Sequence, residues 1–120
     1  MLAPHDINES LPLIYMWEIR DRDGQLRGRY VGKAKAGAGR PLMHYKRNVR
    51  NILLNRPYRK GKPDGYRRVH VALAEAQRDG MEVTLHFLCN VSADDDINEV
   101  ERRLIRERDC VGPAPWQLNG

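Results

Sequence analysis

Apolar and polar positions alternate along the chain in segments that predict three strands and three helices. Residues 13–19 and 29–33 are short apolar segments, and the Asp23-Gly24 pair between them favours the positive φ angles of a tight hairpin turn. Residues 81–89 form a third strand with alternating apolar side chains. With the helices described next, the order is strand, strand, helix, helix, strand, helix. This order predicts an α+β fold, with a small three-stranded antiparallel sheet flanked by helices.

Three other segments have helical periodicity. Residues 40–54 carry an apolar stripe formed by Leu42, Tyr45, Val49, Ile52 and Leu53. Nearly opposite lies a polar, mostly basic stripe formed by Arg40, His44, Arg47 and Asn51. Residues 67–78 predict a second helix, which ends before an Asp-Gly pair. Ser92 and Asp95 resemble a capping box, so we expect the last helix to extend from there to about residue 108.

The turn between the first two strands predicts how they pair. A two-residue turn sets Tyr15 opposite Gly32 and Trp17 opposite Tyr30. Opposed residues share a face of a sheet, so both tyrosines are expected on one face as diagonal neighbours. A bulge at Gly28 would break this register.

Length and charge limit the class of protein. At 120 residues the chain is expected to form one domain, and Lys and Arg outnumber Asp and Glu by 21 to 16. A basic balance fits a polyanionic partner such as nucleic acid, although many globular proteins are basic. No apolar run approaches ~18 residues and the N-terminus has no signal-peptide pattern. We therefore expect a soluble, cytoplasmic protein with no membrane partner, and its oligomeric state stays open.

One acidic residue lies on the apolar stripe of the last predicted helix. That stripe consists of Ile97, Val100, Leu104 and Ile105. Glu101 belongs to it, whereas Glu99 and Glu107 fall on the solvated side. A carboxylate on an inward stripe is costly unless it meets a cation or a hydrogen-bond donor. Glu101 is therefore a candidate metal ligand, and the ordinary alternative is a stripe-edge glutamate that pairs with an arginine.

Five polar positions recur along the chain at spacings that packing does not require. In order, they are Tyr15 in Leu13-Ile14-Tyr15, Tyr30 in Tyr30-Val31-Gly32, Arg40 with His44 after a glycine-rich loop, Glu101 at the start of residues 101–105, and Asn119 after Leu118. This ordered set resembles the GIY-YIG nuclease superfamily, and the resemblance spans nearly all of residues 1–120. The first triplet lacks the family's glycine but keeps its tyrosine.

The resemblance implies a metal-dependent endonuclease, a hydrolase that cuts phosphodiester bonds of DNA. At the family's glutamate position, Glu101 is implied to hold a single Mg²⁺ or Mn²⁺ ion that assists the leaving 3′ oxygen. Arg40, supported by His44 and Lys33, is implied to neutralise the phosphate. For Arg40 and His44, the ordinary alternative is a solvated helix face.

The two tyrosines and Asn119 complete the implied site. Either Tyr15 or Tyr30 is implied to orient or deprotonate the attacking water, which requires nearby cations because a free tyrosine has a pKa near 10. Asn119 takes the place of the family's closing asparagine, although the interval from Glu101 is longer than usual. Without the resemblance, the tyrosines are ordinary core aromatics and Asn119 is a tail residue.

Further basic residues are candidates for binding the nucleic-acid backbone. Residues 55–66 contain prolines and glycines that indicate an exposed loop, in which Tyr58 and Tyr66 are interleaved with basic residues. The expected nucleic-acid contacts are Lys33, Arg47, Lys60, Lys62, Arg67 and Arg68. The alternative is a solvated loop.

Two other functions remain open at this point. A DNA- or RNA-binding module could keep the same fold and basic face without cutting, and a basic scaffold subunit could position nucleic acid for a partner. Only a nuclease has a physical reason to retain Tyr15, Tyr30, Arg40 and Glu101 together.

Overall fold

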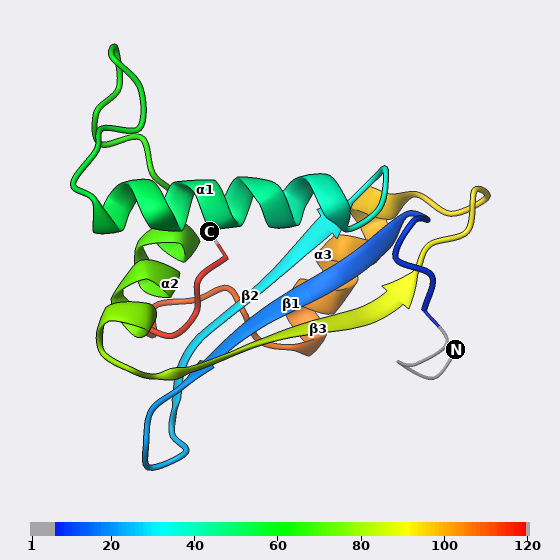
Figure 1. Cartoon of the computed structure of the whole chain (residues 1–120). Coiled ribbons are helices and arrows are strands. Elements are labelled where there is room, and N and C mark those ends of the chain that lie inside the picture. The colour runs from blue at the N-terminus through cyan, green and yellow to red at the C-terminus, as the bar shows by residue number, and fades with distance from the viewer. Residues whose placement is uncertain (1–6, 120) are drawn as a thin grey trace.

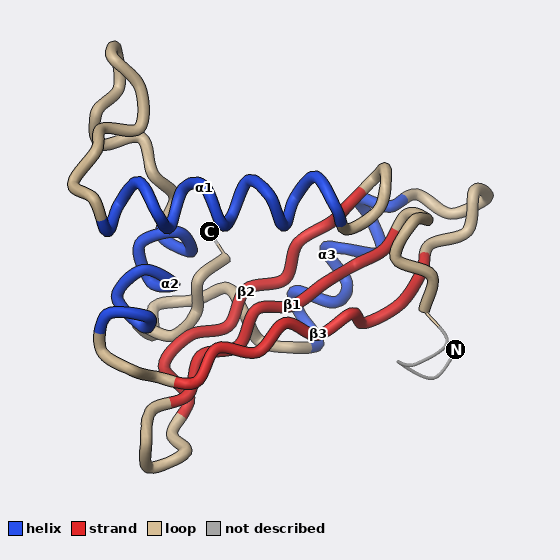
Figure 2. The backbone as a smooth tube through the Cα atoms, viewed as in Figure 1, coloured by secondary structure: helices blue, strands red, loops and turns tan. Residues whose placement is uncertain are grey.

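The computed structural model describes residues 7–119 and contains six elements (Figures 1 and 2). They are β1 (Leu13–Arg20), β2 (Leu26–Ala34), α1 (Gly39–Leu53), α2 (Arg68–Arg78), β3 (Glu82–Asn90) and α3 (Ile97–Glu107). The predicted element order and the α+β class are confirmed.

The three strands form one antiparallel sheet in the order β2-β1-β3. Helices α1 and α2 cover one face of the sheet and α3 covers the other (Figure 1). Side chains of the central strand alternate between the two cores, so Leu13 packs on the α1 side and Ile14 on the α3 side, both fully buried. Because β1 lies in the middle, β2 and β3 each keep one edge free of strand neighbours.

The pairing of β1 with β2 follows the predicted register. Tyr15 lies opposite Gly32 and Trp17 lies opposite Tyr30. All three aromatic side chains belong to the core beneath α1 and α2. The prediction that Tyr15 and Tyr30 share a face is therefore confirmed.

The predicted two-residue turn is wrong, although the register survives. The N–H of Asp21 donates to the carbonyl oxygen of Gln25 at 3.0 Å, which encloses a three-residue loop. Gly24 ends this loop with a φ of 80°, a left-handed conformation that glycine adopts without strain. The pairing then skips Arg27, and this β-bulge restores the register from Gly28 onward. Loop and bulge each shift the pairing by one residue, and the two shifts cancel.

The last helix begins later than the sequence indicated. Asp96 caps α3, because its side chain accepts the N–H of Asn98 at 2.9 Å. Ser92 and Asp95 instead close a turn, in which the N–H of Asp95 donates to the Ser92 carbonyl oxygen at 3.0 Å. The apparent capping box is therefore a turn that precedes the helix.

The C-terminal tail, expected to be irregular, pairs with the free edge of β2. The N–H of Arg29 donates to the Trp116 carbonyl oxygen at 2.8 Å, and the N–H of Leu118 donates to the Arg29 carbonyl oxygen at 3.1 Å. These bonds satisfy part of an exposed strand edge and hold the tail beside Tyr30. In the described part of the chain, no helix is long and apolar enough to cross a membrane.

Candidate active site

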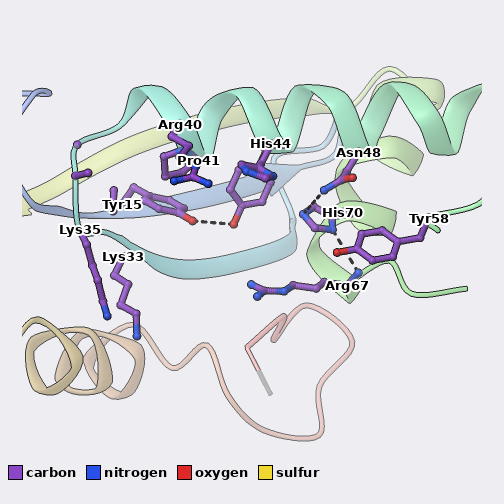
Figure 3. A pocket seen from close by; sticks show the side chains of 14 residues that line it. Tyr15, Lys33, Lys35, Arg40, Pro41, His44, Asn48, Tyr58, Arg67 and His70 are labelled. Atoms are coloured by element: carbon purple, nitrogen blue, oxygen red, sulfur yellow. Dashed lines mark hydrogen bonds between the residues drawn. The ribbon is translucent and has the colours of Figure 1, made fainter. Parts of the chain in front are cut away.

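A pocket of about 430 Å³ lies where α1, the N-terminal end of α2 and the end of β2 meet. Most of its polar lining is basic or aromatic, as Figure 3 shows. The lining includes Tyr15, Lys33, Arg40, His44, Arg67 and His70. All of these except His70 were predicted as catalytic or nucleic-acid-binding residues. One cavity thus joins side chains from β1, β2, α1 and the start of α2 that are distant in sequence.

Tyr15 is held in the wall of the pocket by a second tyrosine. Its hydroxyl lies 2.9 Å from that of Tyr45, and both side chains are buried. Burial raises the pKa of Tyr15 to about 12 and the pKa of Tyr45 still further. Both hydroxyls are therefore neutral near pH 7, and each serves mainly as the other's partner.

The glycine opposite Tyr15 makes room for the aromatic ring. A Cβ at Gly32 would lie 2.5 Å from the ring and hydroxyl atoms of Tyr15. The ring therefore lies directly over the backbone of the neighbouring strand, which only glycine permits. This packing gives the Tyr30-Val31-Gly32 triplet a physical reason for its glycine.

Tyr30 is half-buried, and its hydroxyl has a different partner. Nη1 of Arg67 donates to the Tyr30 hydroxyl oxygen at 3.4 Å. The sequence placed Arg67 at the start of the second helix and grouped it with the loop lysines as a contact to the nucleic-acid backbone. In the structure it caps α2 and lines the pocket, apart from those lysines.

The N-terminal end of α1 is suited to an anion. No side chain caps this end, its first turn has no acidic residue, and Arg40 occupies that turn instead. A cation beside the positive end of a helix dipole is unfavourable unless an anion is also present. His44, one turn further, is exposed toward the same pocket, and its Nδ1 lies 2.9 Å from Nη2 of Arg47. A phosphate group would relieve this accumulation of positive charge.

Glu101 reaches the edge of the site through Lys33. Its Oε1 lies 3.7 Å from Nζ of Lys33, and its side chain is 19% exposed. The same ammonium donates to the side-chain oxygen of Asn98, which lies one turn earlier on α3. Glu101 is half-buried, in keeping with its place on the apolar stripe, and it pairs with a basic side chain as in the ordinary alternative, with a lysine in place of the arginine.

These oxygen atoms fit a magnesium or manganese ion. Within residues 7–119, no three His, Cys, Asp or Glu side chains gather closely enough to hold a metal by themselves. Mg²⁺, however, accepts one carboxylate or two and keeps several waters. Glu101 with Asn98 is such a hard, oxygen-only set, and the Lys33 ammonium resting against both shows that they attract a cation.

Asn119 acts on the backbone of β2. Its side-chain oxygen accepts the N–H of Val31, and its Nδ2 donates to the carbonyl oxygen of Val31, both at 2.8 Å. The side chain is buried, and both of its polar groups are used in this pair. Asn119 therefore positions the strand segment that carries Tyr30 and Gly32.

His70 lines the pocket, although no pattern in the sequence pointed to it. The side chain is 8% exposed, and its Nδ1 accepts the N–H of Arg67 at 3.3 Å. Burial, with the charges of Arg67 and His44 nearby, lowers the pKa of His70 to about 4. Its Nε2 lies 3.4 Å from the buried amide of Asn48, so a polar contact joins α1 to α2 beneath the site.

The basic loop extends away from the pocket. Residues 55–66 project beyond the C-terminal end of α1 (Figure 1), and Lys60, Lys62 and Arg68 are exposed outside the pocket lining. Tyr58 is the part of the loop that reaches the lining, and its ring centroid lies 5.2 Å from that of Tyr66. Of the predicted backbone contacts, Lys33 and Arg67 line the pocket and Lys60 and Lys62 lie on the loop. Arg47 on α1 and Arg68 at the start of α2 lie outside both groups.

No protein-family model, curated protein or solved structure matches this chain.

Proposed function

We propose that the protein is a metal-dependent endonuclease of the GIY-YIG type that hydrolyses phosphodiester bonds of DNA. The observation that carries the proposal is the meeting of Tyr15, Arg40 and His44 in one pocket, with Glu101 at its edge beside Lys33. Packing alone gives no reason for these side chains to converge from four separate elements.

The charge of the pocket supports a phosphodiester as the substrate. Lys33, Arg40 and Arg67 place three cations around a cavity of about 430 Å³, and the uncapped end of α1 adds backbone N–H groups. Phosphate accepts paired hydrogen bonds from arginine and is a common ligand of helix N-termini. In the proposed reaction, Arg40 donates to the phosphate oxygens and offsets the charge that develops there.

The two tyrosines have different roles in this proposal. Tyr15 is buried and bonded to Tyr45, so we assign it to the wall of the pocket. Tyr30 is the more accessible tyrosine, and we assign its oxygen to orient the attacking water and take its proton. We expect Tyr30→Phe to lower the single-turnover cleavage rate by a large factor while leaving a measurable residual rate, whereas Tyr15→Phe lowers the rate by a smaller factor at a temperature where the variant is folded.

Glu101 and Asn98 are the residues that would hold a divalent cation. When bound, Mg²⁺ or Mn²⁺ supplies positive charge for the phosphate and the leaving 3′ oxygen. Lys33 shares these oxygen atoms, so its ammonium must move away when a metal ion enters. Asn119 holds the backbone of β2 at Val31, the residue after Tyr30, and so helps to fix the position of Tyr30 relative to α1.

A DNA- or RNA-binding module without catalytic activity is the second candidate. The ion pair of Lys33 with Glu101 favours it, because a carboxylate that is neutralised by a lysine has less need of a metal. In such a module Arg40 and the loop lysines would still bind phosphate, and Glu101 would contribute only to the stability of the fold.

Incubation with supercoiled plasmid and with branched DNA, each with Mn²⁺ or with EDTA, tests the proposal. The matched pair of variants is Glu101→Gln and Glu107→Gln, since Glu107 is an exposed glutamate on the same helix. We expect Mn²⁺-dependent nicking by the wild type and by Glu107→Gln, none by Glu101→Gln, and similar DNA binding by all three. Binding without cleavage by the wild type would establish the second candidate instead. Cleavage in EDTA, or by Glu101→Gln, would contradict the role of the metal.

A further inference from the structure

We propose that Arg67 is a positioning residue for Tyr30, so that the start of α2 takes part in the reaction. This inference rests on the proposed function. It distinguishes Arg67 from Lys60 and Lys62, with which the sequence analysis grouped it as a contact to the nucleic-acid backbone. It also gives the start of α2 a role in positioning a catalytic side chain.

The contact on which the inference rests joins two elements that are distant in sequence. Nη1 of Arg67, at the start of α2, donates to the hydroxyl oxygen of Tyr30 on β2 at 3.4 Å. Arg67 lines the pocket, and Tyr30 belongs to the strand segment whose backbone Asn119 holds. Arg67 is exposed to solvent, and among the described residues its guanidinium is the side-chain donor that reaches the Tyr30 hydroxyl.

The backbone of Arg67 is itself anchored. Its N–H donates to Nδ1 of His70 at 3.3 Å, as Figure 3 shows. The ring of His70 is buried and packs edge-on against Tyr45, with ring centroids 5.3 Å apart. The side chain of Arg67 therefore extends from a fixed point, and a fixed donor is what a positioning residue requires.

The chemistry follows from the number of donors and acceptors. A phenol oxygen accepts at two lone pairs, and guanidinium can only donate. With Arg67 on one lone pair, the other is left for a water molecule. In the proposed step, Tyr30 acts as its phenolate, after its own proton has left to the solvent, and it takes a proton from the water as a water O–H bond breaks. The water oxygen bonds to phosphorus, and the bond from phosphorus to the 3′ oxygen breaks, with its electron pair going to that oxygen. The donor bond from the guanidinium is charge-assisted, so it holds the tyrosine oxygen in place beside the water.

Tyr15, the neighbouring tyrosine, has a different kind of hydrogen-bond partner. The Tyr15 hydroxyl is bonded to the neutral hydroxyl of Tyr45 rather than to a cation. The other end of the same helix supplies a second contrast, because Arg78 is absent from the pocket lining. Arg67 and Arg78 are thus arginines of the same charge at opposite ends of α2, and of the two Arg67 lines the site.

The experiment compares Arg67→Gln with Arg78→Gln, with Arg67→Lys as the conservative variant. Single-turnover cleavage at saturating enzyme gives the rate, and a titration in EDTA gives the affinity for the same DNA. We expect Arg67→Gln to lower the rate by about tenfold or more, with less than threefold change in affinity. Arg67→Lys should recover part of the rate, and Arg78→Gln should leave the rate unchanged.

A rate cycle separates positioning from a structural role. In the Tyr30→Phe background, Arg67→Gln should cause no further loss of rate, because the group through which it acts is gone. An equal loss in both backgrounds, or a loss of affinity with no loss of rate, would overturn the proposal. The second result would return Arg67 to the backbone contacts.

A spectroscopic measurement without DNA keeps this test distinct from the test of the function. With ¹³C at the ring carbon that bears the hydroxyl, the Tyr30 signal is assigned by its absence in Tyr30→Phe. It should move in Arg67→Gln and stay in place in Arg78→Gln. An unmoved signal overturns the contact. A moved signal in a protein that cuts no DNA overturns the proposed function, and with it the catalytic role of the contact.

Discussion

The hydroxyl groups of Tyr15 and Tyr45 lie 2.9 Å apart, one from the central strand and one from helix α1, and their rings meet edge to face. Each is the buried partner that the other needs, since an unbonded hydroxyl in this position would lose its water without compensation. The contact ties the helix that carries Arg40 and His44 to the sheet that carries Tyr30. The geometry of the pocket therefore depends on this one pair.

Removing either hydroxyl should expose this dependence. Tyr15→Phe and Tyr45→Phe should each lower the free energy of unfolding by about 1 to 2 kcal/mol, because each leaves a buried hydroxyl unpaired. The double variant should cost less than the sum of the two by about 1 kcal/mol, since no orphan hydroxyl remains. Urea unfolding of the four proteins measures the coupling. Strictly additive losses would show that the two hydroxyls are not bonded.

The ring of Tyr15 also determines which residue the opposite strand can carry. Gly32→Ala should lower the free energy of unfolding by about 1 to 3 kcal/mol, because its Cβ would meet a rigid ring at 2.5 Å. Gly61→Ala is the control, since a Cβ there meets nothing within 4 Å. We expect the control to change stability by less than about 0.5 kcal/mol in the same urea titration. Equal effects at the two sites would contradict the packing of Tyr15 on Gly32.

His70 should make stability depend on pH in a defined window. Burial lowers its pKa to about 4 in the folded state, while the unfolded chain keeps a value of 6.5. The unfolded state then binds the proton more readily, so the contribution to stability is complete above pH 6.5. It declines as the pH falls toward 4, by roughly 3 kcal/mol in total.

The check is urea unfolding at several pH values from 7 to 4. His70→Asn, which keeps an acceptor near the N–H of Arg67, should flatten the curve over this window. His44→Asn should flatten the curve by a smaller amount, because it removes one of the lesser causes of the lowered His70 pKa and leaves the burial of His70 in place. A wild-type curve that is flat between pH 6.5 and 4 would show that His70 is not held neutral.

Arg40 and the loop should differ in what they contribute to DNA binding and cleavage. Arg40 lies in the pocket at the end of α1, so Arg40→Ala should lower the single-turnover cleavage rate far more than it weakens binding. Replacing Lys60, Lys62 and Arg68 with glutamine should weaken binding and leave the cleavage rate at saturation unchanged. For every phosphate that these side chains neutralise in the wild type, the slope of log affinity against log salt should become shallower by about 0.9 in the variant.

The corresponding measurement is a binding titration over a salt series, beside single-turnover cleavage. If the triple variant binds with an unchanged salt slope, the loop does not contact the DNA backbone. The basic face of α1, with Arg47, would then be the better candidate for that contact.

Much of the arrangement follows from the sequence because it depends on local periodicity. Side chains alternate along a strand, so the spacing of Tyr15 and Tyr30 across one hairpin was enough to place them on one face. Helical periodicity likewise placed Glu101 on the inward side of α3. The wrong loop length at the Asp23-Gly24 turn left the predicted strand register correct, because a bulge in β2 compensated for the additional loop residue.

Other features were decided only by the tertiary structure. Tyr45 fits an apolar stripe, and nothing in its spacing shows that its hydroxyl would meet Tyr15. By sequence, Arg67 begins a helix directly after an exposed loop, and Asn119 belongs to an irregular tail. Their partners, Tyr30 and the backbone of Val31, lie on a strand more than thirty residues away. Such contacts depend on how the helices and the tail pack against the sheet, and the angle of that packing results from all the side chains in the interface together. Local periodicity determines which face a residue occupies, but only packing determines which atom it meets.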